Sequence, residues 1–120
     1  MELKGKSALI TGAGRGIGQA IALAYARQGA NLSLAARSIS ELEETALECR
    51  NEGSEVLITP TDVTELDQVE ALVEATVERF STIDILVNNA GIAGPLGQLE
   101  HNDLTAWVSV IQVNLIGVFL

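Results

Sequence analysis

Four short segments of the chain are almost continuously apolar and rich in aliphatic and β-branched residues, and they cover residues 7–11, 31–36, 55–59 and 83–88. A strand with one wet face alternates apolar and polar positions, whereas a strand covered on both faces is apolar throughout. The four segments therefore predict strands of a parallel sheet that is covered on both faces.

Helical periodicity separates these strands. The first helix is predicted from Gly16 to Gln28, with Gly29 as its stop and an apolar face made of Ile17, Ala20, Ile21 and Ala24. The second opens on the capping-box pattern Ser40-x-x-Glu43 and runs to Gly53. The third is predicted from Thr64 to Phe80, with an acidic outer face and one apolar stripe that contains Val69, Leu72, Val73, Thr76, Val77 and Phe80.

Alternation of strands and helices is typical of right-handed crossover connections. The predicted fold class is α/β, with a doubly wound parallel sheet. After residue 91 a loop leads to a helical run that starts near residue 104 and shows no stop signal. We expect an incomplete domain, in which residues 1–120 form the N-terminal portion and a helix follows the fourth strand.

Charge and cysteine content narrow the function classes. Sixteen acidic and seven basic residues give a formal net charge of −9, which argues against nucleic acid or an anionic membrane as a partner. The single cysteine, Cys49, excludes an internal disulfide and falls on the apolar side of the second helix, so we expect it to face the core. The N-terminus lacks an apolar signal region, and we expect a cytoplasmic protein without a metal site.

Four glycines lie in TGAGRGIG, residues 11–18, directly after the first predicted strand. The spacing does not fit the common dinucleotide fingerprint, because Ile17 stands where the third glycine would fall, and no Lys-Ser or Lys-Thr pair completes a P-loop. In a parallel sheet, however, this turn directs helix N–H groups at a ligand. We expect Gly12 to form the tight turn, Gly16 to admit a pyrophosphate and Gly18 to pack helix on strand. The position predicts a Rossmann-type dinucleotide site, and the alternative is a glycine-rich turn without a ligand.

The end of the second strand bears on the choice between NADP and NAD. NAD-selective domains usually place a carboxylate there for the ribose 2′-hydroxyl, but this chain reads Ala35-Ala36-Arg37-Ser38. The Arg37 guanidinium suits a 2′-phosphate, and Arg15 in the glycine loop adds a second cation. NADP(H) is the predicted cofactor. Alternatively, Arg37 only ends its strand in solvent and NAD(H) binds.

Four motifs together resemble the N-terminal half of the classical short-chain dehydrogenase/reductase family: residues 11–18, Asp62-Val63, NNAG at 88–91, and Asn114 in VNL. Bacterial 3-oxoacyl-acyl-carrier-protein reductases are the most similar members. The resemblance implies that Asp62 and Val63 hold the adenine, that residues 89–91 line its ribose, and that Asn88 ties strands together. It also implies homo-oligomers, and Asn114 as part of a catalytic tetrad. Read without the resemblance, Asp62 is a turn residue before a helix.

The family's proton donor is a tyrosine in a Tyr-x-x-x-Lys helix, but the single tyrosine here, Tyr25, is followed by Gly29 at the lysine position. The sequence is therefore interpreted as the cofactor-binding portion of an NADP(H)-dependent oxidoreductase that acts on a small carbonyl or alcohol substrate, and as inactive by itself. The alternative is a catalytically silent dinucleotide-binding or subunit-interaction module. The candidate catalytic residue is Asn114, and the candidate cofactor-binding residues are Gly12, Arg15, Gly16, Ile17, Gly18, Arg37, Ser38, Asp62, Val63, Asn89, Ala90 and Gly91.

Overall fold

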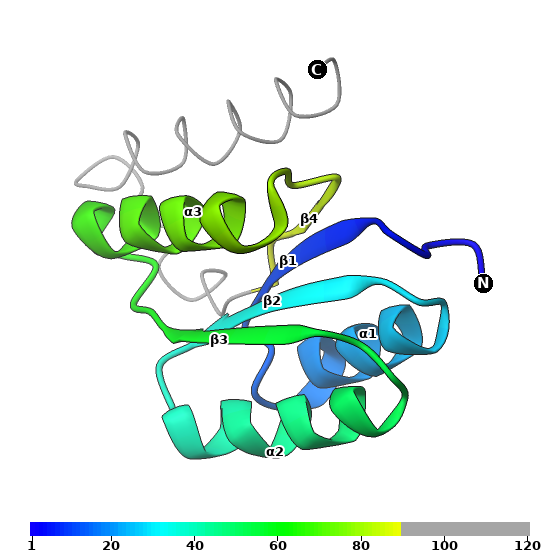
Figure 1. Ribbon diagram of the computed structural model, residues 1–120. Coiled ribbons are helices and arrows are strands. Elements are labelled where there is room, and N and C mark those ends of the chain that lie inside the picture. Colours follow the sequence, from blue (N-terminus) through cyan, green and yellow to red (C-terminus); the bar gives the residue numbers. More distant parts are fainter. Residues whose placement is uncertain (90–120) are drawn as a thin grey trace.

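The computed structural model describes residues 1–89, which form a parallel sheet flanked by helices (Figure 1). The strands are β1 (Ser7–Thr11), β2 (Asn31–Ala36), β3 (Val56–Pro60) and β4 (Ile85–Val87), in the order β3-β2-β1-β4. The helices are α1 (Gly16–Arg27), α2 (Ile39–Asn51) and α3 (Leu66–Phe80). All strand pairs are parallel, which confirms the doubly wound α/β fold. The helix expected from residue 104 lies outside the described residues.

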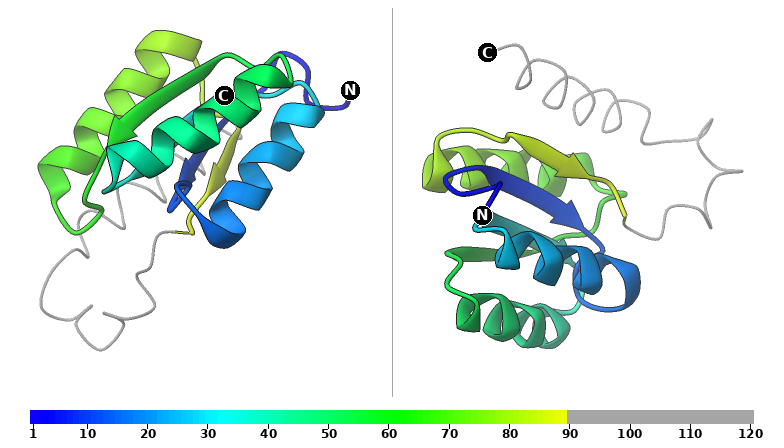
Figure 2. Two further views of the ribbon diagram at one scale, coloured as in Figure 1. Left: turned by 90° about the horizontal axis from the view of Figure 1, so that it is seen from below. Right: turned by 90° about the vertical axis from the view of Figure 1, so that its right-hand side faces the viewer.

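Both faces of the sheet are covered, with α1 and α2 on one side and α3 on the other (Figures 1 and 2). Side chains alternate between the two layers along each strand. Leu32 and Leu34 of β2 lie in the cluster with α1 and α2, whereas Leu9 of β1 and Ala35 of β2 pack with Leu72 of α3. The apolar character of the central strands thus follows from burial on both faces.

The buried face of α1 differs from the predicted one. Gly18, Ala22 and Ala26 are buried, while Ile17 is 71% exposed; of the four predicted positions, Ile21 packs against the core. This helix is apolar nearly all round, so the bulkiest side chains were a poor guide to its orientation. The smallest residues face the sheet because they let the helix backbone approach it closely.

The start of α2 also corrects a prediction. Its N-cap is Ser38, whose hydroxyl accepts a hydrogen bond from the Glu41 N–H at 3.3 Å, so the helix begins before the expected Ser40. The spacing of Ser38 and Glu41 follows the same Ser-x-x-Glu pattern, placed two residues earlier. Cys49 is fully buried, as predicted, and burial raises the pKa of its thiol to about 11.

The third helix follows its predicted stripe at Val69, Leu72 and Thr76, which are buried, although Val77 is 42% exposed. The helix begins at Leu66 rather than Thr64, because residues 61–65 form a turn first. No helix within residues 1–89 is both long and apolar enough to span a membrane.

Candidate cofactor-binding site

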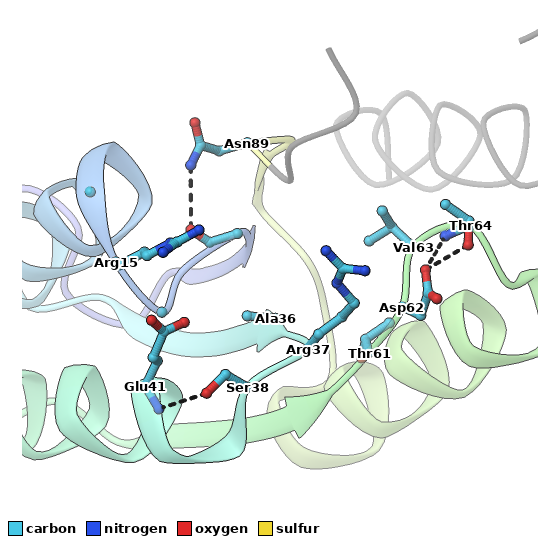
Figure 3. Close-up of a pocket in the computed structure, with 13 residues that line it drawn as sticks. Arg15, Ala36, Arg37, Ser38, Glu41, Thr61, Asp62, Val63, Thr64 and Asn89 are labelled. Carbon is cyan, nitrogen blue, oxygen red and sulfur yellow. Dashed lines mark hydrogen bonds between the residues drawn. The ribbon is translucent and has the colours of Figure 1, made fainter. Parts of the chain in front are cut away.

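The carboxyl ends of the strands open into a cavity of about 740 Å³. Its size lies within the usual range of roughly 300 to 1,000 Å³ for ligand pockets. Figure 3 shows side chains from the loops after β1, β2 and β3 converging on it, together with Asn89 after β4. The lining residues are Gly12, Gly14, Arg15, Gly16, Ala36, Arg37, Ser38, Glu41, Thr61, Asp62, Val63, Thr64 and Asn89.

The glycine loop between β1 and α1 needs glycine at three positions for different reasons. Gly12 and Gly16 have φ of +63° and +60°, in the left-handed region that side chains avoid. A Cβ built on Gly16 meets no atom of residues 1–89 within 4 Å, so this position is open toward the cavity beside the first turn of α1. A Cβ on Gly18 would lie 2.0 Å from the Gly12 carbonyl oxygen, so α1 packs directly on the loop.

Four charged side chains line the cavity, and their formal charges balance. Arg15 and Arg37 are cationic, while Glu41 and Asp62 are anionic. Figure 3 shows the Arg37 side chain pointing into the space between the glycine loop and the Asp62 loop. Within residues 1–89, no hydrogen bond or ion pair holds the Glu41 carboxylate. The sum of these charges thus favours neither a phosphate nor a hydroxyl, and only their positions can distinguish the two ligands.

Asp62 is held by the turn that precedes α3. Its Oδ1 accepts hydrogen bonds from the Thr64 N–H at 2.9 Å and from the Thr64 hydroxyl at 2.6 Å. These bonds, with a smaller contribution from the charge of Arg37, lower the pKa of the Asp62 carboxyl. Among residues 1–89, no hydrogen bond uses the second carboxylate oxygen or the Val63 N–H. Asp62 is thus a turn residue that also lines the cavity.

The residues that follow β4 are hydrogen-bonded to the end of β1. The Thr11 hydroxyl lies 3.2 Å from Asn88 Oδ1 and accepts a bond from the Asn89 N–H at 3.0 Å. The Asn89 amide donates to the Gly12 carbonyl at 3.4 Å. These contacts join the ends of β1 and β4 and bring Asn89 beside the glycine loop.

Most predicted cofactor residues meet at this cavity, namely Gly12, Arg15, Gly16, Arg37, Ser38, Asp62, Val63 and Asn89. Gly18 is buried behind the loop, and Ile17 is exposed and does not line the cavity. Ala90, Gly91 and Asn114 lie outside the described residues.

Sequence reasoning missed five lining residues: Gly14, Ala36, Glu41, Thr61 and Thr64. Two of them carried a signal. Glu41 stands three residues after Ser38 in a capping pattern, and Thr64 follows Asp62 at the spacing of an Asx turn.

Comparison with known proteins decides the family. The family profile described as short chain dehydrogenase matches residues 6–120. The chain belongs to the short-chain dehydrogenase family. Its relatives include a protein assigned as ketoacyl reductase 1 of the granaticin polyketide synthase in Streptomyces violaceoruber, which is 47% identical over 113 residues, or 94% of this chain and 41% of that protein. A 3-oxoacyl-[acyl-carrier-protein] reductase of Synechocystis is 40% identical over 98% of this chain and 48% of its own length.

A short chain dehydrogenase/reductase of Burkholderia phymatum, solved in complex with NAD, has a TM-score of 0.68 and is 41% identical over 72% of this chain and 31% of that one. The chain spans less than half the length of these three proteins. The short-chain dehydrogenase fold and the likeness to 3-oxoacyl reductases were both predicted correctly from the motifs.

The residues present fit a nicotinamide dinucleotide, the cofactor type of the solved relative. The open side of Gly16 leaves room for a pyrophosphate beside the N-terminus of α1. The second Asp62 oxygen and the Val63 N–H, which have no hydrogen-bond partner among residues 1–89, form an acceptor and donor pair that complements the edge of an adenine.

Proposed function

We propose that the protein carrying this chain is an NADP(H)-dependent oxidoreductase, and that residues 1–120 are the N-terminal portion of its cofactor-binding domain. The observation that carries the proposal is the glycine loop, which brings the open Gly16 position and the start of α1 to one cavity at the carboxyl edge of the sheet. In such a site the bound cofactor would supply or accept a hydride. The chain's residues would bind and orient it.

The preference for NADP(H) over NAD(H) rests on two guanidinium groups. Arg37 follows β2, where NAD-selective domains carry an acidic residue, and Arg15 lies across the cavity in the glycine loop. Both are exposed and could close on a 2′-phosphate with charge-assisted hydrogen bonds. Glu41 opposes this preference, and the Burkholderia relative binds NAD. The proposal is therefore that the two arginines outweigh Glu41, whose carboxylate has no hydrogen bond or ion pair within residues 1–89.

For the substrate we propose a 3-oxoacyl thioester or a related small ketone or alcohol, since two relatives are named for ketoacyl reduction. Asn114 is the proposed catalytic residue in this chain. Because the 120 residues hold no Tyr-x-x-x-Lys, we expect them to bind cofactor without turning over substrate. We further propose a homo-oligomer in the cytoplasm.

The test is to titrate the whole protein that carries this chain with NADPH and with NADH by calorimetry, and then to repeat the titration with Arg37→Asp combined with Arg15→Ala. Loss of charge-assisted phosphate contacts should weaken NADPH binding by about 1.5 to 3 kcal/mol and leave NADH binding nearly unchanged. Equal affinity of the unmutated protein for the two cofactors would contradict the NADP(H) proposal. Oxidation of NADPH with 3-oxoacyl thioesters, compared with simple ketones, tests the substrate class.

A further inference from the structure

A buried hydroxyl on α2 is bonded to the glycine loop. The Thr45 side chain is fully buried, and its Oγ1 donates to the Ala13 carbonyl oxygen at 3.0 Å, with the Gly14 carbonyl oxygen at 3.4 Å. A threonine inside a helix commonly bonds the carbonyl four residues earlier, as Thr76 does with Leu72 at 2.7 Å. The hydroxyl of Thr45 bonds instead to another element, the loop that borders the cavity.

Within residues 1–89, few other hydrogen bonds hold the loop between Gly12 and Gly16, which both have positive φ. The Ala13 N–H donates to the Ala35 carbonyl oxygen of β2 at 3.1 Å, and Ala13 is fully buried. Its carbonyl therefore cannot turn to water if the Thr45 hydroxyl is removed, and a buried acceptor without a donor is costly. Glycine by itself does not fix a loop conformation, because it admits many backbone angles.

Helix α2 also fits closely against the next loop residue. A Cβ built on Gly14 would lie 2.9 Å from the Glu41 Cβ, one helical turn before Thr45. Two positions on one face of α2 thus hold residues 13 and 14, directly before the Arg15 and Gly16 positions that line the cavity.

We propose that Thr45 is a positioning residue for the dinucleotide: its hydroxyl fixes Ala13 and so sets where the N–H groups of residues 14–16 point. This role rests on the proposed function, because it acts on the loop that would receive the pyrophosphate. Thr45 itself does not line the cavity.

The experiment compares Thr45→Val, which keeps the shape and removes the hydroxyl, with Thr45→Ser, which keeps the hydroxyl. Thr76→Val is the matched control, since Thr76 is an equally buried threonine whose hydroxyl contacts Ser33 at 2.7 Å on the opposite side of the sheet. Each variant of the whole protein is examined by thermal melting, by NADPH and NADH titration, and by amide hydrogen exchange of residues 14–16 without cofactor.

We expect Thr45→Val to lose about tenfold in affinity for both cofactors, as an unpaired buried acceptor would predict. Its loop amides should exchange faster, and Thr45→Ser should restore both properties. Thr76→Val should lower the melting temperature without changing affinity or loop exchange. If Thr45→Val does not fold, Thr45→Ala and Thr45→Ser provide the same contrast, because both lack the methyl group and only one lacks the hydroxyl.

Wild-type affinity and loop exchange in Thr45→Val would overturn the positioning role, and so would an equal loss of affinity in Thr76→Val. An unmutated protein that binds neither cofactor would instead overturn the proposed function and the cofactor role with it. Hydrogen exchange would still show whether Thr45 anchors the loop, so the two failures are distinguishable.

Discussion

Helices α1 and α3 lie on opposite faces of the sheet and contact it through different kinds of residue. On the α1 side, the helix meets the sheet and the glycine loop through Gly18, Ala22 and Ala26. On the α3 side, Val69 and Leu72 fill the space with larger side chains. Small residues bring one backbone against another, whereas large ones add apolar contact area. We therefore expect the α1 contacts to set the geometry of the glycine loop, and the α3 contacts to contribute to stability alone.

The largest effect is expected from substitutions that disrupt one of these two helix contacts at a time. Gly18→Ala adds a Cβ where the Gly12 carbonyl oxygen lies 2.0 Å away, so α1 and the loop must separate. We expect this displacement to abolish NADPH binding and also to lower the free energy of unfolding. Leu72→Ala should cost about 2 to 5 kcal/mol of unfolding free energy while the folded protein keeps its affinity.

Calorimetry and chemical denaturation on the same samples measure both quantities. The proposed role of the α1 contacts is wrong if Gly18→Ala binds NADPH with the affinity of the unmutated protein. The proposed role of the α3 contacts is wrong if Leu72→Ala loses NADPH affinity under conditions where it is fully folded.

The second effect concerns the open glycine. Gly16→Val should abolish cofactor binding but leave secondary structure intact, because a Cβ here meets no atom of residues 1–89 within 4 Å and the position lines the cavity. The positive φ adds strain of about 1 to 3 kcal/mol. Gly53→Val is a matched control at the end of α2, with φ of +96° and equally open surroundings but no place in the cavity. Circular dichroism and cofactor titration should show similar folds and opposite binding, and equal binding by the two variants would refute the role of Gly16.

The same contrast explains what could be predicted from the sequence. The stripe of α3 was visible because its buried positions are large and its outer face is acidic. The face of α1 was predicted wrongly because its contacts use glycine and alanine, which carry little hydrophobic signal. The cap at Ser38 was missed because a second serine at Ser40 offered the same pattern.

The site shows a similar limit. Gly12, Arg37 and Asp62 each follow a predicted strand of a parallel sheet. Because the carboxyl ends of parallel strands lie at one edge, the sequence predicted that these residues meet there. The capping pattern Ser38-x-x-Glu41 indicates the start of a helix, but it does not assign Glu41 or Thr45 to the site. Their roles depend on how α2 docks against the glycine loop, and that docking is a tertiary contact without a local sequence signature.

A smaller effect is expected from the charge of Glu41, which lines the cavity on the α1 and α2 side. Glu41→Gln removes a negative charge near the proposed phosphate position and should raise NADPH affinity by roughly 0.5 to 1 kcal/mol. NADH affinity should change less. Glu44→Gln, on the exposed side of the same helix, is the control for overall charge. Titrations at low and high salt should show the difference shrinking with salt, and an equal gain in both variants would exclude a local effect.

The smallest effect concerns the loop through which the α3 side reaches the cavity. Thr64 bonds stabilise the charged form of Asp62 and hold its pKa below the ordinary value of 3.8. A lowered native pKa means that the folded state binds this proton less readily than the unfolded state, so the stabilisation is present above about pH 4. It is lost as the pH falls through the native pKa.

Asp62→Asn should therefore lower the melting temperature slightly at pH 7, and the difference in melting temperature from the unmutated protein should disappear in acid. Thr64→Val should weaken the same pH dependence, because it removes the bond from the threonine hydroxyl. A gap between Asp62→Asn and the unmutated protein that stays constant from pH 7 to pH 3 would show that the turn holds Asp62 for its shape and not for its charge.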